Sequence, residues 1–148
     1  MAILAAIDEN ERSKQVVEIA YDLATTYDDT LVALHVAPLE EFEAHKESLR
    51  EMSGFSDFSF TQHEDSAKRF AKEFVRNTIP NADTERVEGR GRVGDITDQI
   101  LAEASAVNPR FLVISGRRRS PTGKAVFGNT AQQILLQADC PVVTKLGE

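Results

Sequence analysis

The chain has 148 residues, of which 41% are hydrophobic and 28% are charged, and its formal net charge is −7. This length suits one domain, since chains usually divide only beyond roughly 250 residues, and the composition is that of a globular protein, neither disordered nor fibrous. Net acidity makes binding of nucleic acid unlikely, and the apolar runs fall well short of the ~20 residues of a membrane span. We therefore expect one domain over residues 1–148 that does not enter a membrane.

The first part of the chain alternates buried-strand and helix patterns. Ala2–Ile7 is a continuous apolar run, which is typical of a strand covered on both faces in a parallel sheet. Apolar residues recur at helical spacing in Ser13–Tyr27, and Thr30–Val36 predicts a second buried strand that Pro38 ends. Leu39–Phe60 has no clean period, so we expect an irregular or partly helical excursion there.

The middle of the chain predicts one helix and one weak strand. Helical spacing returns in Asp65–Ile79 and stops at Pro80. Thr84–Glu88 follows as a weak strand, flanked by Asn81 on one side and by Gly89 and Gly91 on the other.

The last part of the chain repeats the alternation. Asp95 has the position of an N-cap for a helix that ends before a proline. Phe111–Ile114 predicts a third strongly buried strand, and Ser115–Phe127 predicts a loop. Asn129–Gln137 predicts a short helix, and Pro141–Leu146 predicts a final strand.

This alternation of strands and helices is typical of βαβ units on a parallel sheet with helices on both faces. We therefore predict the α/β class, as a Rossmann-like three-layer sandwich. Its sheet should hold five parallel strands in the order 3-2-1-4-5, with the apolar first strand in the centre.

The beginning of the chain and its cysteine content predict the cellular compartment. Residues 1–7 lack a charged start and a cleavage site, and acidic residues follow at once, so they do not predict a signal peptide. Cys140 is the single cysteine, so no internal disulfide can form, which fits a reducing compartment. We expect a cytoplasmic protein.

The predicted sheet places two loops at a ligand site. Ligands of such sheets bind beyond the carboxyl ends of the strands, where the strand order reverses. The loops there would be the acidic one beginning at Asp8 and the one beginning at Ser115. The second loop lies in a stretch of 35 residues, 104–138, without an acidic side chain. The basic residues of this 35-residue stretch are Arg110, Arg117, Arg118, Arg119 and Lys124.

Glycine and charge together favour a phosphate-binding loop. Gly116, Gly123 and Gly128 would let backbone N–H groups approach a phosphate, and Gly128 opens a helix whose N-terminus attracts anions. A solvated surface loop is the alternative. The segment is not a Walker A loop, because Ala125 follows Gly-Lys where that motif needs Ser or Thr.

Asp8 also has two interpretations. It is either a ligand-facing carboxylate that accepts from an adenine or ribose group, or part of the cap of the next helix, where Asn10 or Ser13 could cap instead. His35 lies in an apolar run, so we expect a satisfied core or strand-end histidine. No catalytic triad, metal cluster or carboxylate pair is evident in the sequence, which predicts no catalytic residue and no metal ligand.

Three segments together resemble the universal stress protein superfamily, over Met1–Leu146. They are a first strand ending in Ile7-Asp8, a second ending in Leu34-His35-Val36, and a late Gly-rich loop that leads into Pro-Val-Val-Thr. The resemblance implies a stress-response or sensor protein that binds ATP with Mg²⁺ as counter-ion, with at most slow hydrolysis. It also implies a homodimer joined through the last strand, 141–146.

The late loop of ATP-binding members follows Gly-x2-Gly-x9-Gly-[Ser/Thr], and this chain matches it in part. Gly116 matches the first glycine and Gly128 the third, with a spacer one residue shorter. Arg119 stands at the second glycine, and Asn129, followed by Thr130, stands at the Ser or Thr.

The resemblance therefore implies a nucleotide site with a nucleoside end and a phosphate end. The nucleoside end would comprise Ile7, Asp8, Val36, Ser115 and Gly116. The phosphate end would comprise Arg117, Arg119, Gly128, Asn129 and Thr130. The alternative is a nucleotide-free interaction module with a degenerate site, which would use its arginine loop on an anionic partner.

Overall fold

The computed structural model describes residues 1–38, 59–117 and 128–147. The elements are β1 (Ala2–Ile7), α1 (Arg12–Tyr27), β2 (Thr30–Pro38), α3 (Ser59–Thr78), β3 (Val87–Gly94), α4 (Ile96–Val107), β4 (Phe111–Arg117), α5 (Asn129–Gln137) and β5 (Val142–Gly147). The expected excursion over residues 39–60 lies outside the described residues, except for its last two positions, which begin α3. No helix in the described ranges has the length and apolar character needed to cross a membrane.

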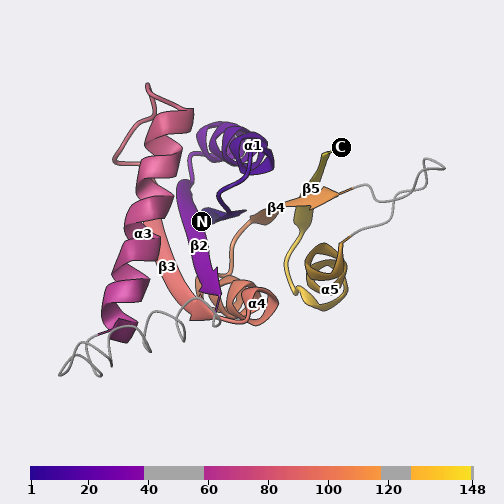
Figure 1. Cartoon of the computed structure of the whole chain (residues 1–148). Helices are drawn as coiled ribbons and strands as arrows, with labels where there is room; N and C mark the ends of the chain where they lie inside the picture. Colours follow the sequence, from indigo (N-terminus) through magenta and orange to yellow (C-terminus); the bar gives the residue numbers. More distant parts are fainter. Residues whose placement is uncertain (39–58, 118–127, 148) are drawn as a thin grey trace.

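The five strands form one parallel sheet in the order β3-β2-β1-β4-β5, which confirms the predicted topology. Figure 1 shows α1 and α3 on one side of this sheet and α4 and α5 on the other. The core is correspondingly divided into two clusters, one on each face of the sheet.

Strand β1 lies in the centre and contributes to both clusters. Ile3, Ala5 and Ile7 pack in the cluster under α1 and α3, whereas Leu4 packs in the cluster under α4 and α5. Because both faces are covered, each position in the strand favours an apolar residue, and this explains the uninterrupted run in the sequence.

The prediction for β3 was wrong in its extent. The strand covers Val87–Gly94, so Gly89 and Gly91 lie inside it and do not flank it. Helix α3 crosses the strand so closely that a Cβ on Gly91 would lie 2.5 Å from the backbone nitrogen of Lys68. The strand therefore requires glycine at position 91 because the helix backbone approaches it closely. In the sequence alone, such a glycine looks the same as one that ends a strand.

Strand β4 also differs from its prediction. Residues 115–117 were expected to begin a loop, but they continue the strand, since Ser115 pairs with Lys145 and Gly116 with Leu146 of β5. The remainder of the expected loop, residues 118–127, lies outside the described residues.

The helix starts confirm one predicted cap and correct another. The side chain of Asp95 accepts a hydrogen bond from the N–H of Asp98 at 3.0 Å, as an N-cap does. Helix α1 instead has Glu11 at its N-cap position without a side-chain bond, so neither Asn10 nor Ser13 caps it. The Ser13 hydroxyl instead accepts a hydrogen bond from the N–H of Asp8 at 2.8 Å.

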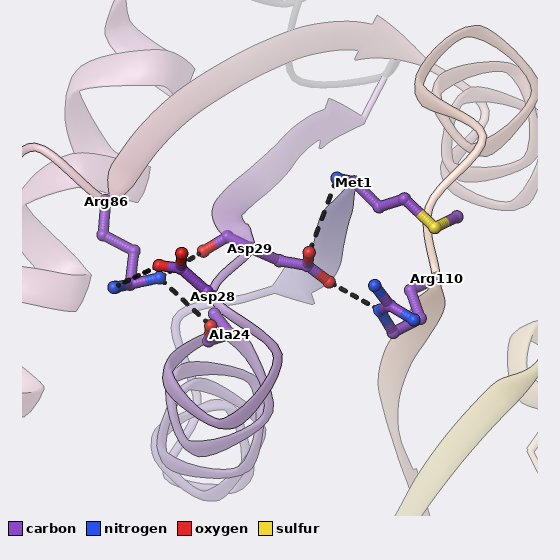
Figure 2. A network of polar contacts seen from close by, with 6 residues as sticks. All are labelled: Met1, Ala24, Asp28, Asp29, Arg86 and Arg110. Atoms are coloured by element: carbon purple, nitrogen blue, oxygen red, sulfur yellow. Dashed lines mark hydrogen bonds and ion pairs between the residues drawn. The ribbon is translucent and has the colours of Figure 1, made fainter.

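A buried carboxylate ties the strand starts together at the edge of the sheet opposite to the carboxyl ends. Figure 2 shows Asp29, which precedes β2, between Arg110, which precedes β4, and the amino group of Met1. The Asp29 side chain is 3% exposed, and its oxygens lie 2.7 Å from Arg110 Nε and 3.4 Å from the Met1 nitrogen. Arg86 donates to the carbonyl of Asp29 at 2.9 Å.

The hydrogen bond from Arg110 lowers the pKa of Asp29 below its ordinary value of 3.8, against an opposing effect of burial. A carboxyl whose pKa is lower in the folded chain stabilises the fold above its unfolded pKa, and this contribution is lost as the pH falls through the folded pKa.

We therefore expect Asp29→Asn to lower the free energy of unfolding near neutral pH, and the difference from wild type to shrink below about pH 4. Urea denaturation over a pH series measures this difference. Glu18→Gln, at an exposed position of α1, is the matched control and should follow wild type throughout. A difference for Asp29→Asn that stays constant down to pH 3 would show that the charge of Asp29 is not its source.

Candidate functional site

The carboxyl ends of β1, β2 and β4 and the beginnings of α4 and α5 enclose a cavity of about 320 Å³. This volume lies at the lower end of the roughly 300–1,000 Å³ of small-molecule sites. Its lining residues are Ala6, Ile7, Asp8, Asn10, Arg12, Ser13, Leu34, Val36, Ile96, Ile100, Ile114, Ser115, Gly116, Gly128, Asn129, Thr130, Ala131 and Ile134.

Most of the residues predicted for the site line this cavity. They are Ile7, Asp8, Val36, Ser115, Gly116, Gly128, Asn129 and Thr130. They come from three strand ends and one helix start that are far apart in the sequence, and the parallel pairing of the strands brings them to one edge of the sheet.

Two predicted residues have side chains outside the described part of the structure. Arg117 is described only as the last residue of β4, and Arg119 lies outside the described residues altogether.

The cavity has an apolar wall on the α4 and α5 side. Leu34 and Val36 of β2 and Ile114 of β4 are buried in the cluster on this face, together with Ile100 of α4. Such a wall accommodates the flat face of an aromatic ring, whereas polar groups at the strand ends are available to its edges.

The start of α5 forms another part of the cavity lining. Gly128 is the N-cap residue and has no side chain to bond the first N–H groups of the helix. A Cβ built on Gly128 meets no atom of the described residues within 4 Å. Unpaired N–H groups at a helix N-terminus favour an anion, and here they adjoin the cavity.

Two polar atoms at the cavity are buried without a hydrogen-bond partner. Asn10 Oδ1 and Arg12 Nε are among the few such side-chain atoms in the described part of the chain. Arg12 extends its methylene groups over β5, where its Cδ would lie 2.7 Å from a Cβ on Gly147. A buried donor without an acceptor costs about 1–3 kcal/mol, so an acceptor on a ligand would be favourable there.

Sequence reasoning did not identify Arg12, and it considered Asn10 and Ser13 only as caps. A basic residue just after an acidic loop carries no motif of its own. The available signal was its position at the first turn of a helix that follows the central strand, at the edge where ligands bind.

The described residues contain no group of three or more His, Cys, Asp or Glu side chains that could hold a metal ion. Burial raises the pKa of the Cys140 thiol, and this cysteine does not line the cavity. A thiol of raised pKa is a poor nucleophile.

The comparisons with known proteins agree with this fold. The model of the universal stress protein family matches residues 1–144, and the chain therefore belongs to the universal stress protein family. A universal stress protein of Mycolicibacterium smegmatis is 37% identical over 49 residues, which are 33% of this chain and 38% of that protein. The match thus spans well under half of this curated relative.

Solved structures extend the likeness over almost the whole chain. A universal stress protein in complex with cAMP has a TM-score of 0.63 and 16% identity, covering 98% of this chain and 95% of the other. The universal stress protein of Archaeoglobus fulgidus in complex with dAMP has a TM-score of 0.58 and 19% identity, covering 97% and 96%. At these identities the likeness establishes the fold.

Proposed function

We propose that this universal stress protein binds an adenine nucleotide, ATP with Mg²⁺ as its counter-ion, in the cavity at the carboxyl ends of the strands. The observation that carries the proposal is that, among the described residues, one cavity combines an apolar wall and a carboxylate with a helix N-terminus that has no side-chain cap and an arginine whose buried Nε has no partner. Structures of the same fold in complex with cAMP and dAMP support the choice of an adenine nucleotide.

The chemistry of the lining assigns the two ends of the ligand. The adenine would lie against Leu34 and Val36, and the ribose hydroxyls would donate to the Asp8 carboxylate. The phosphates would meet the N–H groups that follow Gly128, and Arg12 would supply a cation. Mg²⁺ would arrive with the phosphates.

The expected role is that of a sensor in the stress response, whose state depends on nucleotide occupancy. Hydrolysis would be slow at most, because the lining offers neither a nucleophile–base pair nor a metal cluster among the described residues. The competing function is a nucleotide-free interaction module that uses the arginine loop, and a failure of ATP to bind would favour it.

The first test is stabilisation by ligand. Wild type should gain about 2.7 kcal/mol of stability with MgATP at about 100 times its Kd, because ligand binds only the folded chain. Gly128→Val should weaken binding on the order of tenfold, since its side chain would lie in front of the first N–H groups of α5. Thermal shift and calorimetric titration measure both effects.

Gln132→Val is the matched control for this substitution. It adds the same side chain to α5 one turn later, at an exposed position that does not line the cavity. It should bind as wild type. If Gly128→Val also binds as wild type, the phosphates do not lie at α5, and if wild type itself gains no stability, the interaction module is the better account.

The second test concerns Arg12. Arg12→Met retains the methylene packing over Gly147 but removes the cation and the unpartnered donor. We expect the Kd for MgATP to rise about tenfold or more, because hydrogen bonds to charged groups contribute about 1.5–3 kcal/mol. The stability of the ligand-free protein should hardly fall, since no protein partner is lost.

Lys14→Met provides the comparison, because it removes the same charge from an exposed position of α1, where Glu11 is the ion-pair partner within the described part of the chain. Equal weakening by the two substitutions at low salt would mean that long-range attraction, and not a contact from Arg12, assists binding.

The proposal includes a homodimer joined through residues 141–146. Strand β5 pairs with β4 on one side and is the last strand of the sheet, so its other edge has backbone groups available to a partner. We expect sedimentation velocity at micromolar concentration to give twice the mass of the chain. A monomer under these conditions would contradict the dimer.

A further inference from the structure

The peptide group that joins Ile7 to Asp8 is held at both of its polar atoms by side chains. The carbonyl oxygen of Ile7 lies 3.0 Å from Nδ1 of His35. The N–H of Asp8 donates to the hydroxyl of Ser13 at 2.8 Å. The two side chains come from β2 and α1, so this one peptide is fixed from two elements at the point where β1 ends.

His35 is well suited to hold the carbonyl. A carbonyl oxygen only accepts, so Nδ1 must carry the hydrogen, and this selects the tautomer of the ring. The ring packs against Phe70 of α3, with centroids 4.4 Å apart and an angle of 47° between the planes. His35 is paired in register with Ile7, the last position of the β1–β2 ladder. The ring therefore secures the strand where the ladder stops.

Ser13 holds the other side of the peptide. It is 1% exposed and lies in the first turn of α1, where its own N–H donates to the carbonyl of Asn10 at 3.1 Å. Its hydroxyl accepts from Asp8, so the turn between β1 and α1 is closed by two hydrogen bonds at this one residue. Because Ser13 is buried, its two hydrogen bonds are shielded from water, and they fix the direction of the chain at Asp8.

The consequence concerns the Asp8 carboxylate. With the preceding peptide fixed, the Cα–Cβ bond of Asp8 has a defined direction, and the N–H of Glu9 donates to Asp8 Oδ1 at 2.8 Å. One oxygen is thus engaged by the backbone, which leaves the other for a ligand. Asp8 lines the cavity, whereas His35 does not.

We propose that Ser13 and His35 are positioning residues, which hold the Ile7–Asp8 peptide so that the Asp8 carboxylate meets the hydroxyl donors of a bound nucleotide. This inference rests on the proposed function, because it assigns a role in nucleotide affinity to residues of the proposed site and to one outside it. This positioning would increase the affinity for the nucleotide, because a carboxylate that is already in place loses less conformational entropy when the ligand binds.

Two substitutions of His35 separate positioning from packing. His35→Phe keeps a ring against Phe70 but has no donor, whereas His35→Asn loses the ring but can place its amide nitrogen close to the former Nδ1. We expect His35→Phe to bind MgATP about fivefold to tenfold more weakly and His35→Asn to remain closer to wild type. Thermal stability should have the opposite order, with His35→Phe the more stable.

Calorimetric titration with MgATP ranks the two variants by affinity, and thermal denaturation ranks them by stability. If affinity simply follows stability across the two variants, His35 is a packing residue and the inference is wrong. The same measurements in an Asp8→Ala background complete a double-mutant cycle. The loss caused by His35→Phe should largely vanish there, and an undiminished loss would show that His35 acts without Asp8.

Hydrogen exchange of the ligand-free protein tests the Ser13 side and separates this inference from the proposed function. The Asp8 amide should be protected in wild type and should exchange about fivefold or more faster in Ser13→Ala. If the Asp8 amide exchanges at the same rate in Ser13→Ala as in wild type, the Ser13 hydroxyl does not hold the Ile7–Asp8 peptide, and the inference is wrong even if MgATP binds. Absence of MgATP binding by wild type would overturn the proposed function, and the positioning role with it, even if the amide is protected.

Discussion

The central position of β1 is the constraint from which the rest of this structure follows. Its parallel pairing with β2 on one side and β4 on the other brings three carboxyl ends to one edge of the sheet. Helices on both faces then bury Ile3 and Leu4 in opposite clusters, which makes the strand wholly apolar up to Asp8. The first polar side chain after the strand consequently lies at the mouth of the cavity and has no place in the core.

The two edges of the sheet use charge differently. At the strand starts, Asp29 is buried and paired with Arg110 and the Met1 amino group, so opposite charges there attract one another and tie segments together. At the carboxyl ends, Arg12 has a buried nitrogen without an acceptor in the described chain. A satisfied network holds a structure, whereas an unsatisfied donor beside a cavity is a place for a ligand.

One end of the site depends on the properties of a single residue, whereas the other depends on contacts between distant segments. Gly128 leaves the start of α5 without a side-chain cap because it has no side chain, which is a property of one residue. The direction of Asp8 depends instead on Ser13 and on His35, the latter 28 residues away in sequence. Substitutions at the two ends of the cavity should therefore act independently, because among the described residues no hydrogen bond joins Asp8 to α5.

The sequence by itself determined the strand order and part of the cavity lining, because continuous apolar runs such as Ala2–Ile7 are typical of strands covered on both faces, and the carboxyl ends of parallel strands share an edge. It did not determine β3, where Gly91 serves the approach of α3, nor the continuation of β4 through Arg117, which depends on pairing with β5. Nor could it reveal Arg12, whose buried nitrogen is defined only once α1 packs over β5. Local patterns record how a residue is covered, whereas close approach, strand pairing and an unsatisfied donor are relations between distant segments, and only the tertiary structure decided them.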